Sequence, residues 1–182
     1  QGVFDKEAVA SIGAIAVAPS EPKVLWVGTG EANDRNSSAW GNGVYRSEDK
    51  GETWTKLANS NPRPSYYSKI HIDPNNDQRI WVLGAQMYNS EDGGKTWRTN
   101  LVQRIHGDYH ALWINPANSN HVINGSDGGI HQSFDKGRTW EHLNGVPLGQ
   151  FYEINADNQK PYNVCGGLQD NGTWHGPSRT MV

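Results

Sequence analysis

The chain of 182 residues lacks the features that identify several common protein classes. It has one cysteine, Cys165, which excludes an internal disulfide. It has no zinc-finger spacing, no apolar stretch long enough to span a bilayer and no recognisable secretory signal peptide. The net charge of −3, with scattered Lys and Arg, gives no electrostatic reason to expect a nucleic acid or membrane partner. No cofactor and no metal ion are expected.

Sustained helical periodicity is also absent. Apolar residues form short runs instead, and three of these runs are closed by Pro19, Pro74 and Pro116. A second short run follows each one. Cys165 lies in such a run, at residues 162–166, so we expect a buried and inert thiol there. The pattern predicts an all-β chain.

The pattern Ser-x-Asp-x-Gly-x-Thr-Trp occurs three times, and successive copies are 43 residues apart. This period is typical of β-propeller blades rather than of helical solenoids. The Ser and Asp side chains can hydrogen-bond turn amides, Gly supplies a positive φ, and Trp begins a strand. The residues expected to hold these turns, called Asp boxes below, are Ser47, Asp49, Gly51, Trp54, Ser90, Asp92, Gly94, Trp97, Ser133, Asp135, Gly137 and Trp140.

The runs and boxes together predict a β-propeller with four-stranded antiparallel blades, about three and a half to four in number. Each Asp box is placed in the turn between the third and fourth strands. The fourth blade has at least three strands. We expect a single propeller domain or propeller segment over residues 1–182, with blades at approximately 11–57, 66–100, 109–143 and 150–176.

An open series of blades would leave apolar sheet faces in water, so the ring must close. One possibility is that residues 3–9 supply the outer strand missing after residues 172–175. A second is that two chains pair through their open faces as a homodimer. A third is that missing blades complete the ring. The sequence leaves these three open.

The loops at the end of the blades opposite the boxes differ between repeats, and they are polar. The first blade carries about a dozen extra residues within 29–43. Variable loops on a regular scaffold commonly carry binding residues, and this mixture of side chains suits a carbohydrate or a peptide. The candidate ligand-binding residues on this rim are Arg35, Trp40, Tyr66, Tyr67, Arg104, His106, His110 and Gln169.

Four rim carboxylates are candidate catalytic residues, namely Glu31, Asp34, Asp108 and Asp170. A glycosidase needs two carboxyl groups about 5 to 5.5 Å apart for retention, or about 6.5 to 9.5 Å apart for inversion. The alternative is that the acidic residues within 29–43 brace the long loop through ion pairs and capped turns.

His106, Asp108 and His110 alternate along the chain. In an extended segment all three side chains would point the same way, as metal ligands or an acid–base cluster require. A hydrogen-bonded network that fixes the inner strand is the alternative, and it is the one we favour.

The Asp boxes resemble those of bacterial-neuraminidase-repeat proteins. Residues 28–33, 108–113 and 166–172 resemble a narrower group, the large bacterial propellers described as glycosyl-hydrolase-like or sortilin-like. The resemblance implies a propeller, a secreted or periplasmic location and a glycosidase ancestry. Members of that group are usually several times longer, so this chain resembles a shortened version. The Phe/Tyr-Arg-Ile-Pro motif of sialidases and the glycine-rich motifs of xyloglucanases are missing, so neither activity is carried over.

The predicted function is therefore an Asp-box propeller module that binds a carbohydrate or peptide on the rim opposite the boxes. One alternative is a glycoside hydrolase that uses the rim carboxylates. Another is a structural fragment of a larger propeller without its own ligand.

Overall fold

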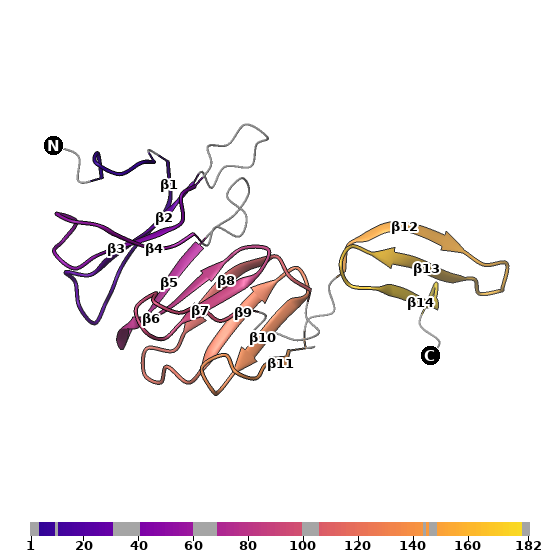
Figure 1. The fold of residues 1–182 in the computed structure, drawn as a ribbon. Coiled ribbons are helices and arrows are strands. Elements are labelled where there is room, and N and C mark those ends of the chain that lie inside the picture. Colours follow the sequence, from indigo (N-terminus) through magenta and orange to yellow (C-terminus); the bar gives the residue numbers. More distant parts are fainter. Residues whose placement is uncertain are drawn as a thin grey trace. The chain divides into compact units, whose positions relative to one another are not determined.

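The computed structural model describes residues 4–9, 11–30, 41–59, 69–99, 106–143, 145 and 149–179. Within these ranges the chain forms fourteen strands and no helix, which confirms the predicted all-β class (Figure 1). The chain divides into two compact units, residues 1–142 and 143–182. The expectation of one domain over the whole chain stays a prediction.

The first unit contains three antiparallel sheets, and in each the strands lie side by side in chain order (Figure 1). The first sheet consists of β1 (Ile12–Val17), β2 (Leu25–Thr29), β3 (Val44–Ser47) and β4 (Thr55–Ala58). The second consists of β5 (Lys69–Asp73), β6 (Asn76–Leu83) and β7 (Met87–Ser90). The third consists of β8 (Tyr109–Ile114), β9 (Val122–Ser126), β10 (Gly129–Ser133) and β11 (Glu141–His142). This up-and-down order is the one expected of propeller blades.

The second unit is a single antiparallel sheet, formed by β12 (Phe151–Ala156), β13 (Asn163–Leu168) and β14 (Thr173–Pro177). All six side chains of β12 are exposed, and so is Cys165 on β13. The prediction of a buried thiol was wrong, because a three-stranded sheet has no second layer of its own to cover this residue.

The second sheet of the first unit has three strands where four were expected. After its Asp box, Arg98 pairs with Asn89 through a single β-bridge, with backbone hydrogen bonds of 2.8 and 3.0 Å. The fourth strand of this sheet is therefore reduced to one pair of residues in the described part of the chain.

The N-terminal segment, residues 4–9, forms turns rather than a strand. The ring of Phe4 lies edge-on to Tyr45 and to Trp54, at centroid distances of 5.2 and 5.1 Å. The described residues 4–9 thus form no outer strand in this structure, and the closure of the ring by residues 3–9 after 172–175 stays a prediction.

Strand β6 is buried on both of its faces. Because successive side chains of a strand point to opposite sides, Ile80 and Val82 face one way while Trp81 and Leu83 face the other. Ile80 and Val82 pack against the first sheet, and Trp81 and Leu83 pack against the third. The second sheet is therefore the middle layer of the first unit.

The first and second sheets meet around Trp26, a fully buried residue of β2 that packs with Ile80 and Val82. The guanidinium of Arg46 lies 5.4 Å above the Trp26 ring. Its Nη2 also donates to Asp77 Oδ2 on the second sheet at 2.9 Å. One side chain thus adds a cation–π contact and an ion pair at the margin of an apolar interface.

The second and third sheets meet around Trp81, which packs with Leu112 and other apolar residues of β8 and β9. Asp73 is fully buried at the end of β5 and is paired with Arg79, 2.6 Å between Oδ2 and Nη1. Ser119 Oγ of the third sheet donates to Asp73 Oδ1, also at 2.6 Å. The buried carboxylate is therefore satisfied from both sheets, as burial of a charge requires.

The three Asp boxes share one hydrogen-bond pattern. In the first box Ser47 Oγ donates to Asp49 Oδ1 at 2.7 Å and accepts from the Gly51 amide at 2.8 Å. Asp49 then accepts from both the amide and the hydroxyl of Thr53. The same bonds recur in the boxes that start at Ser90 and Ser133. The predicted Ser, Asp and Gly roles in these turns therefore correspond to actual contacts.

The glycine of each later box packs closely against the preceding sheet. A Cβ atom on Gly94 would lie 2.9 Å from Leu57 Cδ1 and 3.3 Å from Trp26 Cζ3, and this residue has a φ of +85°. Trp97 Nε1 donates to the Gly94 carbonyl at 3.0 Å, and its ring packs on the first interface. Glycine is needed here for the backbone conformation and for the close approach.

Replacement of Trp81 by alanine is expected to lower the free energy of unfolding by about 3 to 5 kcal/mol, because it leaves a cavity between two sheets. The same change at Trp174, whose side chain is 58% exposed, should cost far less. Urea unfolding followed by tryptophan fluorescence and circular dichroism measures both. Equal losses for the two variants would contradict the burial of Trp81.

The boxes also predict how stability depends on pH. Hydrogen bonds from the threonine side chain and then its amide lower the pKa of Asp49 and Asp92 to about 2, from 3.8. At Asp135 burial raises the pKa, yet bonds from the Thr139 amide and hydroxyl bring it to about 2. Because the folded pKa lies below the unfolded one, this stabilisation is complete above about pH 4 and is lost as the pH falls towards 2.

Asp92→Asn is therefore expected to lower stability at pH 7 and to make the loss of stability between pH 4 and 2 less steep. The thermal midpoint, measured by circular dichroism at half-unit intervals of pH from 7 to 2, tests this. A variant with the wild-type slope below pH 4 would show that this carboxylate contributes nothing to acid unfolding.

Candidate functional site

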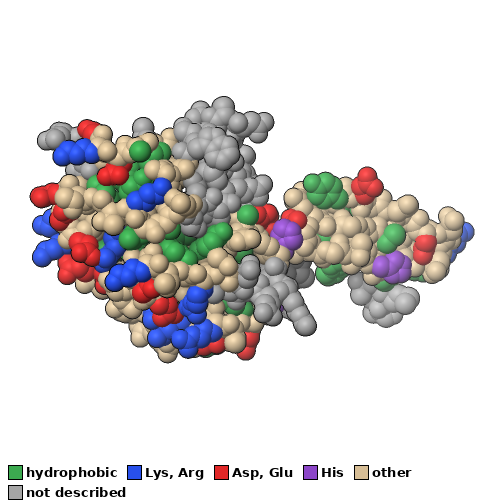
Figure 2. Space-filling model, viewed as in Figure 1, with side chains coloured by type: hydrophobic (Ala, Val, Ile, Leu, Met, Phe, Trp, Pro, Cys, Tyr) green, Lys and Arg blue, Asp and Glu red, His purple; other side chains and the backbone are tan. Residues whose placement is uncertain are grey.

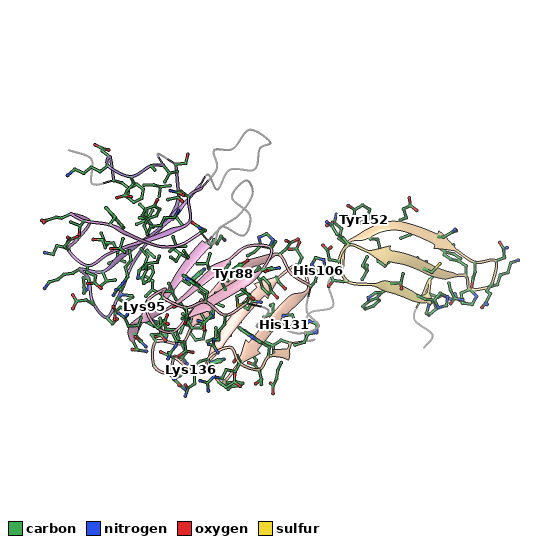
Figure 3. The ribbon with its side chains drawn as sticks, viewed as in Figure 1. Tyr88, Lys95, His106, His131, Lys136 and Tyr152 are labelled. Atoms are coloured by element: carbon green, nitrogen blue, oxygen red, sulfur yellow. The ribbon has the colours of Figure 1, made fainter. Side chains whose placement is uncertain are left out.

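The end of the sheets opposite the Asp boxes forms the rim. In an antiparallel sheet the loop between the second and third strands lies at the opposite end from the turn between the third and fourth. Figure 3 shows this for the first unit: Lys95 and Lys136 of two boxes lie at one end, and His106 lies at the other. In the first unit the described rim consists of residues 11, 30, 41–43, 69, 84–86, 106–110 and 126–128.

One backbone hydrogen bond recurs along the rim. The Gly30 amide donates to the Ser11 carbonyl at 2.9 Å, and the Asp127 amide donates to the Asp108 carbonyl at 3.3 Å. Within the second unit, the Gln169 amide donates to the Gln150 carbonyl at 2.8 Å. In each case the loop after the second strand is tied to the residue before the first strand. The rim loops therefore start from a fixed backbone position.

The segment that leads into β8 is also tied to the second sheet. Asp108 and Tyr109 donate their amides to the carbonyls of Ala85 and Gly84, at 3.3 and 2.8 Å. Lys69 Nζ at the start of β5 donates to the His110 carbonyl at 2.7 Å. Residues 108–110 are thus held by two sheets at once.

His110 contacts Asp127, with 3.0 Å between Nε2 and Oδ1. The two side chains are 37% and 34% exposed, so the pair is accessible from solvent while its backbone is anchored. The Asp108 carbonyl joins this pair by accepting from the Asp127 amide, and the three residues are called the polar cluster below. Asp127 was not among the predicted site residues. Its position in the sequence could have pointed to it. Asp127 directly follows β9, just as the predicted site residues Gln169 and Asp170 directly follow β13.

His106, Asp108 and His110 do not lie in one extended segment, which the metal or acid–base alternative required. Asp108 has a φ of +57°, so the segment is not extended at this residue, and β8 begins only at Tyr109. The left-handed conformation follows from the bonds that hold Asp108 between the loops at Ala85 and Asp127. His106 is exposed and lies before this reversal. The common orientation that three alternating metal ligands would need is therefore not present.

Gln169 and Asp170 lie in the turn between β13 and β14, in the second unit. Asp170 has a φ of +61°, and Asn171 Nδ2 donates to the Gln169 carbonyl at 3.0 Å. The Leu168 amide closes the turn on the Gly172 carbonyl at 2.8 Å. This tight turn presents one predicted carboxylate and one predicted amide side chain at the end of the sheet.

The other predicted site residues lie outside the described part of the chain. These are Glu31, Asp34, Arg35, Trp40, Tyr66, Tyr67 and Arg104. Their roles remain predictions.

Across the described residues, no group of three or more His, Cys, Asp or Glu side chains is placed to hold a metal ion. The same residues include no helix long and apolar enough to cross a membrane. Figure 2 shows acidic and basic side chains interspersed on the visible face of the first unit. This mixed pattern favours a ligand recognised by hydrogen bonds over one attracted by a field of a single sign.

His110→Ala is expected to change the free energy of unfolding by less than about 1 kcal/mol, because polar contacts between partly exposed side chains contribute little to stability. Asp127→Asn should behave in the same way. Urea unfolding curves measure both, and an unchanged circular dichroism spectrum is the control for the fold. If either variant lost as much unfolding free energy as Trp81→Ala, the pair would be part of the structural core and not an accessible surface pair.

The chain is similar to a GH74 xyloglucanase from Xanthomonas campestris, with a TM-score of 0.56, 17% identity, and coverage of 94% of this chain and 30% of that one. It is similar to a GH74 enzyme from Niastella koreensis, with a TM-score of 0.55, 16% identity, and coverage of 92% and 29%. YCF48 bound to a D1 peptide gives a TM-score of 0.54, 16% identity, and coverage of 94% and 53%.

These neighbours are β-propellers, and with the four antiparallel sheets they confirm the predicted propeller fold. At identities this low the likeness concerns the fold alone. The chain spans about 30% of the length of the two GH74 proteins and about half of YCF48.

No curated protein matches the sequence. The family model described as sortilin, neurotensin receptor 3 matches residues 42–165, which is more than half of the chain. This match includes all three Asp boxes and the rim residues 106–110, and it agrees with the resemblance found in the sequence. The chain therefore belongs to the Sortilin-Vps10 family of Asp-box β-propellers.

Proposed function

We propose that this chain is a binding module that takes a carbohydrate or a peptide on the rim opposite the Asp boxes. The observation that carries the proposal is the polar cluster of Asp108, His110 and Asp127. Its side chains are partly exposed, and its backbone is fixed to two sheets. A ligand site needs such a combination of accessible polar groups and a rigid base.

The chemistry of the cluster suits ligands with many hydrogen-bonding groups. Carboxylates accept hydrogen bonds from sugar hydroxyls and peptide amides, and an imidazole can donate or accept. Because the loops are already tied down by backbone bonds, little conformational entropy is lost when a ligand binds. The candidate ligand-binding residues outside the described ranges extend this proposal along the same rim.

The similar structures are consistent with this proposal. YCF48 has a propeller of similar fold and its structure contains a peptide, while the GH74 proteins include a xyloglucanase. Both ligand classes thus occur on related scaffolds. A secreted or periplasmic location, which the family resemblance implies, belongs to the proposal too.

Glycoside hydrolysis is the second candidate function. Asp108 and Asp127 are neighbours on the rim, because the amide of one bonds to the carbonyl of the other. A carboxyl pair is the minimal machinery of most glycosidases. In this version the general acid and its partner come from Glu31, Asp34, Asp108 and Asp170, with Asp127 as an additional partner.

Binding of the full chain to a glycan array and a peptide array tests the proposal. His110→Ala combined with Asp127→Asn should weaken binding to any ligand found by at least about tenfold, because charged hydrogen-bond partners are lost. Glu141→Gln, an exposed change on β11 away from the rim, is the matched control and should bind as wild type.

The same ligands separate the two functions. Hydrolysis of a bound glycan that disappears in Asp108→Asn would favour the hydrolase. Binding without turnover would favour the module. Binding that survives the double change at His110 and Asp127 would place the ligand elsewhere and contradict the rim proposal.

A further inference from the structure

One row of side chains in the third sheet departs from the pattern of the first two sheets. In those sheets the row holds a valine paired with a tyrosine, namely Val27 with Tyr45 and Val82 with Tyr88. In the third sheet the same row pairs Asn124 with His131. The two tyrosines and the histidine each stand two residues before an Asp-box serine, so the positions correspond.

The exchanged positions are buried. Asn124 is fully buried and His131 is only 3% exposed. Leu112, which pairs with Asn124, packs against Trp81, so this row faces the second sheet. Asn124 Nδ2 and Oδ1 and His131 Nδ1 have no hydrogen-bond partner among the described protein atoms. Buried polar groups of this kind lower stability, which a valine and a tyrosine at the same positions would not do.

A second histidine extends the row into β11. The rings of His131 and His142 stack nearly parallel, with centroids 4.5 Å apart and an interplanar angle of 17°. A Cβ atom on Gly129 would lie 2.8 Å from His142 Nε2, so glycine at this position leaves room for the His142 ring. The stack is therefore a close contact between β10 and β11 that the backbone accommodates.

Few other contacts hold β11 on the sheet. This strand consists of Glu141 and His142, which pair with Gln132 and His131. The preceding residue, Trp140, is anchored separately, because its Nε1 donates to a carbonyl of the Asp box at 3.1 Å. The stack thus belongs to one of the two cross-strand pairs of β11. Loss of that pair would release the strand without breaking the box.

A proton on His131 would weaken this contact. Burial lowers the pKa of His131 below its ordinary value of 6.5, and the charge of His142 lowers it further, while the Gly129 backbone acts in the opposite direction. A histidine released from the sheet regains its ordinary pKa, so the released state binds a proton more readily. Because the pKa is lower in the stacked state, the contact is complete above about pH 6.5 and is lost progressively below it.

The other titratable groups on the two packed faces do not offset this effect. On the second sheet they are Lys69, His71 and Arg98. Lys69 Nζ is bonded to a backbone carbonyl of β8, and Arg98 Nη2 is paired with Glu91 Oε1 at 2.8 Å. Burial, and then the charge of Lys69, lower the pKa of His71 to about 4, so this ring is neutral in mildly acidic solution. On β8 the group is Tyr109, and burial raises its pKa.

We propose that the stacked pair of His131 and His142 is a pH-sensitive contact, which holds β11 on the third sheet at neutral pH and releases it in mildly acidic solution. Histidine is the side chain whose charge ordinarily changes in this range of pH. A valine–tyrosine row, as in the other two sheets, has no group that does so. Both rings belong to the first unit, so the inference requires neither a ligand nor the second unit.

Hydrogen–deuterium exchange of the full chain, followed by mass spectrometry, measures the release of β11. Exchange of the peptide that contains β11 is compared at about pH 7.5 and about pH 5, after correction for the intrinsic pH dependence of exchange. Opening should become about tenfold more favourable at the lower pH, because the released histidine binds a proton that the stacked one resists. The bridge between Asn89 and Arg98 is the internal control, because its row carries Tyr88, and it should show no such change.

Two variants locate the sensor. His131→Tyr introduces the residue that the first and second sheets have at this position, and it should remove the pH response while β11 stays paired. His121→Tyr is the matched control, because His121 lies on the opposite face of the same sheet, where its ring stacks on Phe134. This variant should keep the wild-type response.

A carbon-13 NMR titration of the histidine rings in the wild-type chain is a second measurement, which does not depend on the folding of a variant. The His131 signal should reach its midpoint only below about pH 6.5. A midpoint at or above that value, equal opening of β11 at both pH values, or a response that survives in His131→Tyr would each overturn the proposal. Loss of the response in His121→Tyr would also overturn it, because the sensor would then lie elsewhere.

Discussion

The contact between Trp26 or Trp81 on one sheet and the isoleucine and valine side chains of the next is the interaction on which the first unit depends. A sheet of three or four strands cannot bury its side chains by itself. It becomes stable when neighbours cover both faces, as β6 shows with Ile80 and Val82 on one side and Trp81 on the other. The sheets, the boxes and the rim all keep this stacking in place.

The Asp boxes connect local sequence to this stacking. Each is closed by its own Ser, Asp and Thr, so the turn forms from residues that are close in the chain. In the second and third boxes the glycine then permits close approach to the tryptophan of the preceding sheet, as Gly94 does at Trp26. A motif that is local in sequence thus fixes a contact between sheets. The loops of the opposite rim differ from one another in length and chemistry.

The sequence predicted the strands and box turns because both follow from local patterns, namely alternation, closing prolines and a 43-residue period. It did not predict features set by distant contacts. The positive φ of Asp108 depends on bonds to Ala85 and Asp127 in other loops. The exposure of Cys165 depends on which layers cover β13, which its apolar neighbours in the sequence do not reveal. The candidate site was therefore predictable as a rim, but its internal geometry was not.

Backbone conformation separates structural from functional candidates among the polar turns. Four non-glycine residues have positive φ, counting only the described part of the chain: Lys50, Asp108, Lys136 and Asp170. The two lysines occupy a box position that is Gly93 in the second box, so that position needs only the conformation and not a particular side chain. At the rim, carboxylates stand where glycine would adopt the same conformation at lower cost. That contrast makes the side chains of Asp108 and Asp170, rather than their backbone, the reason to look for function at the rim.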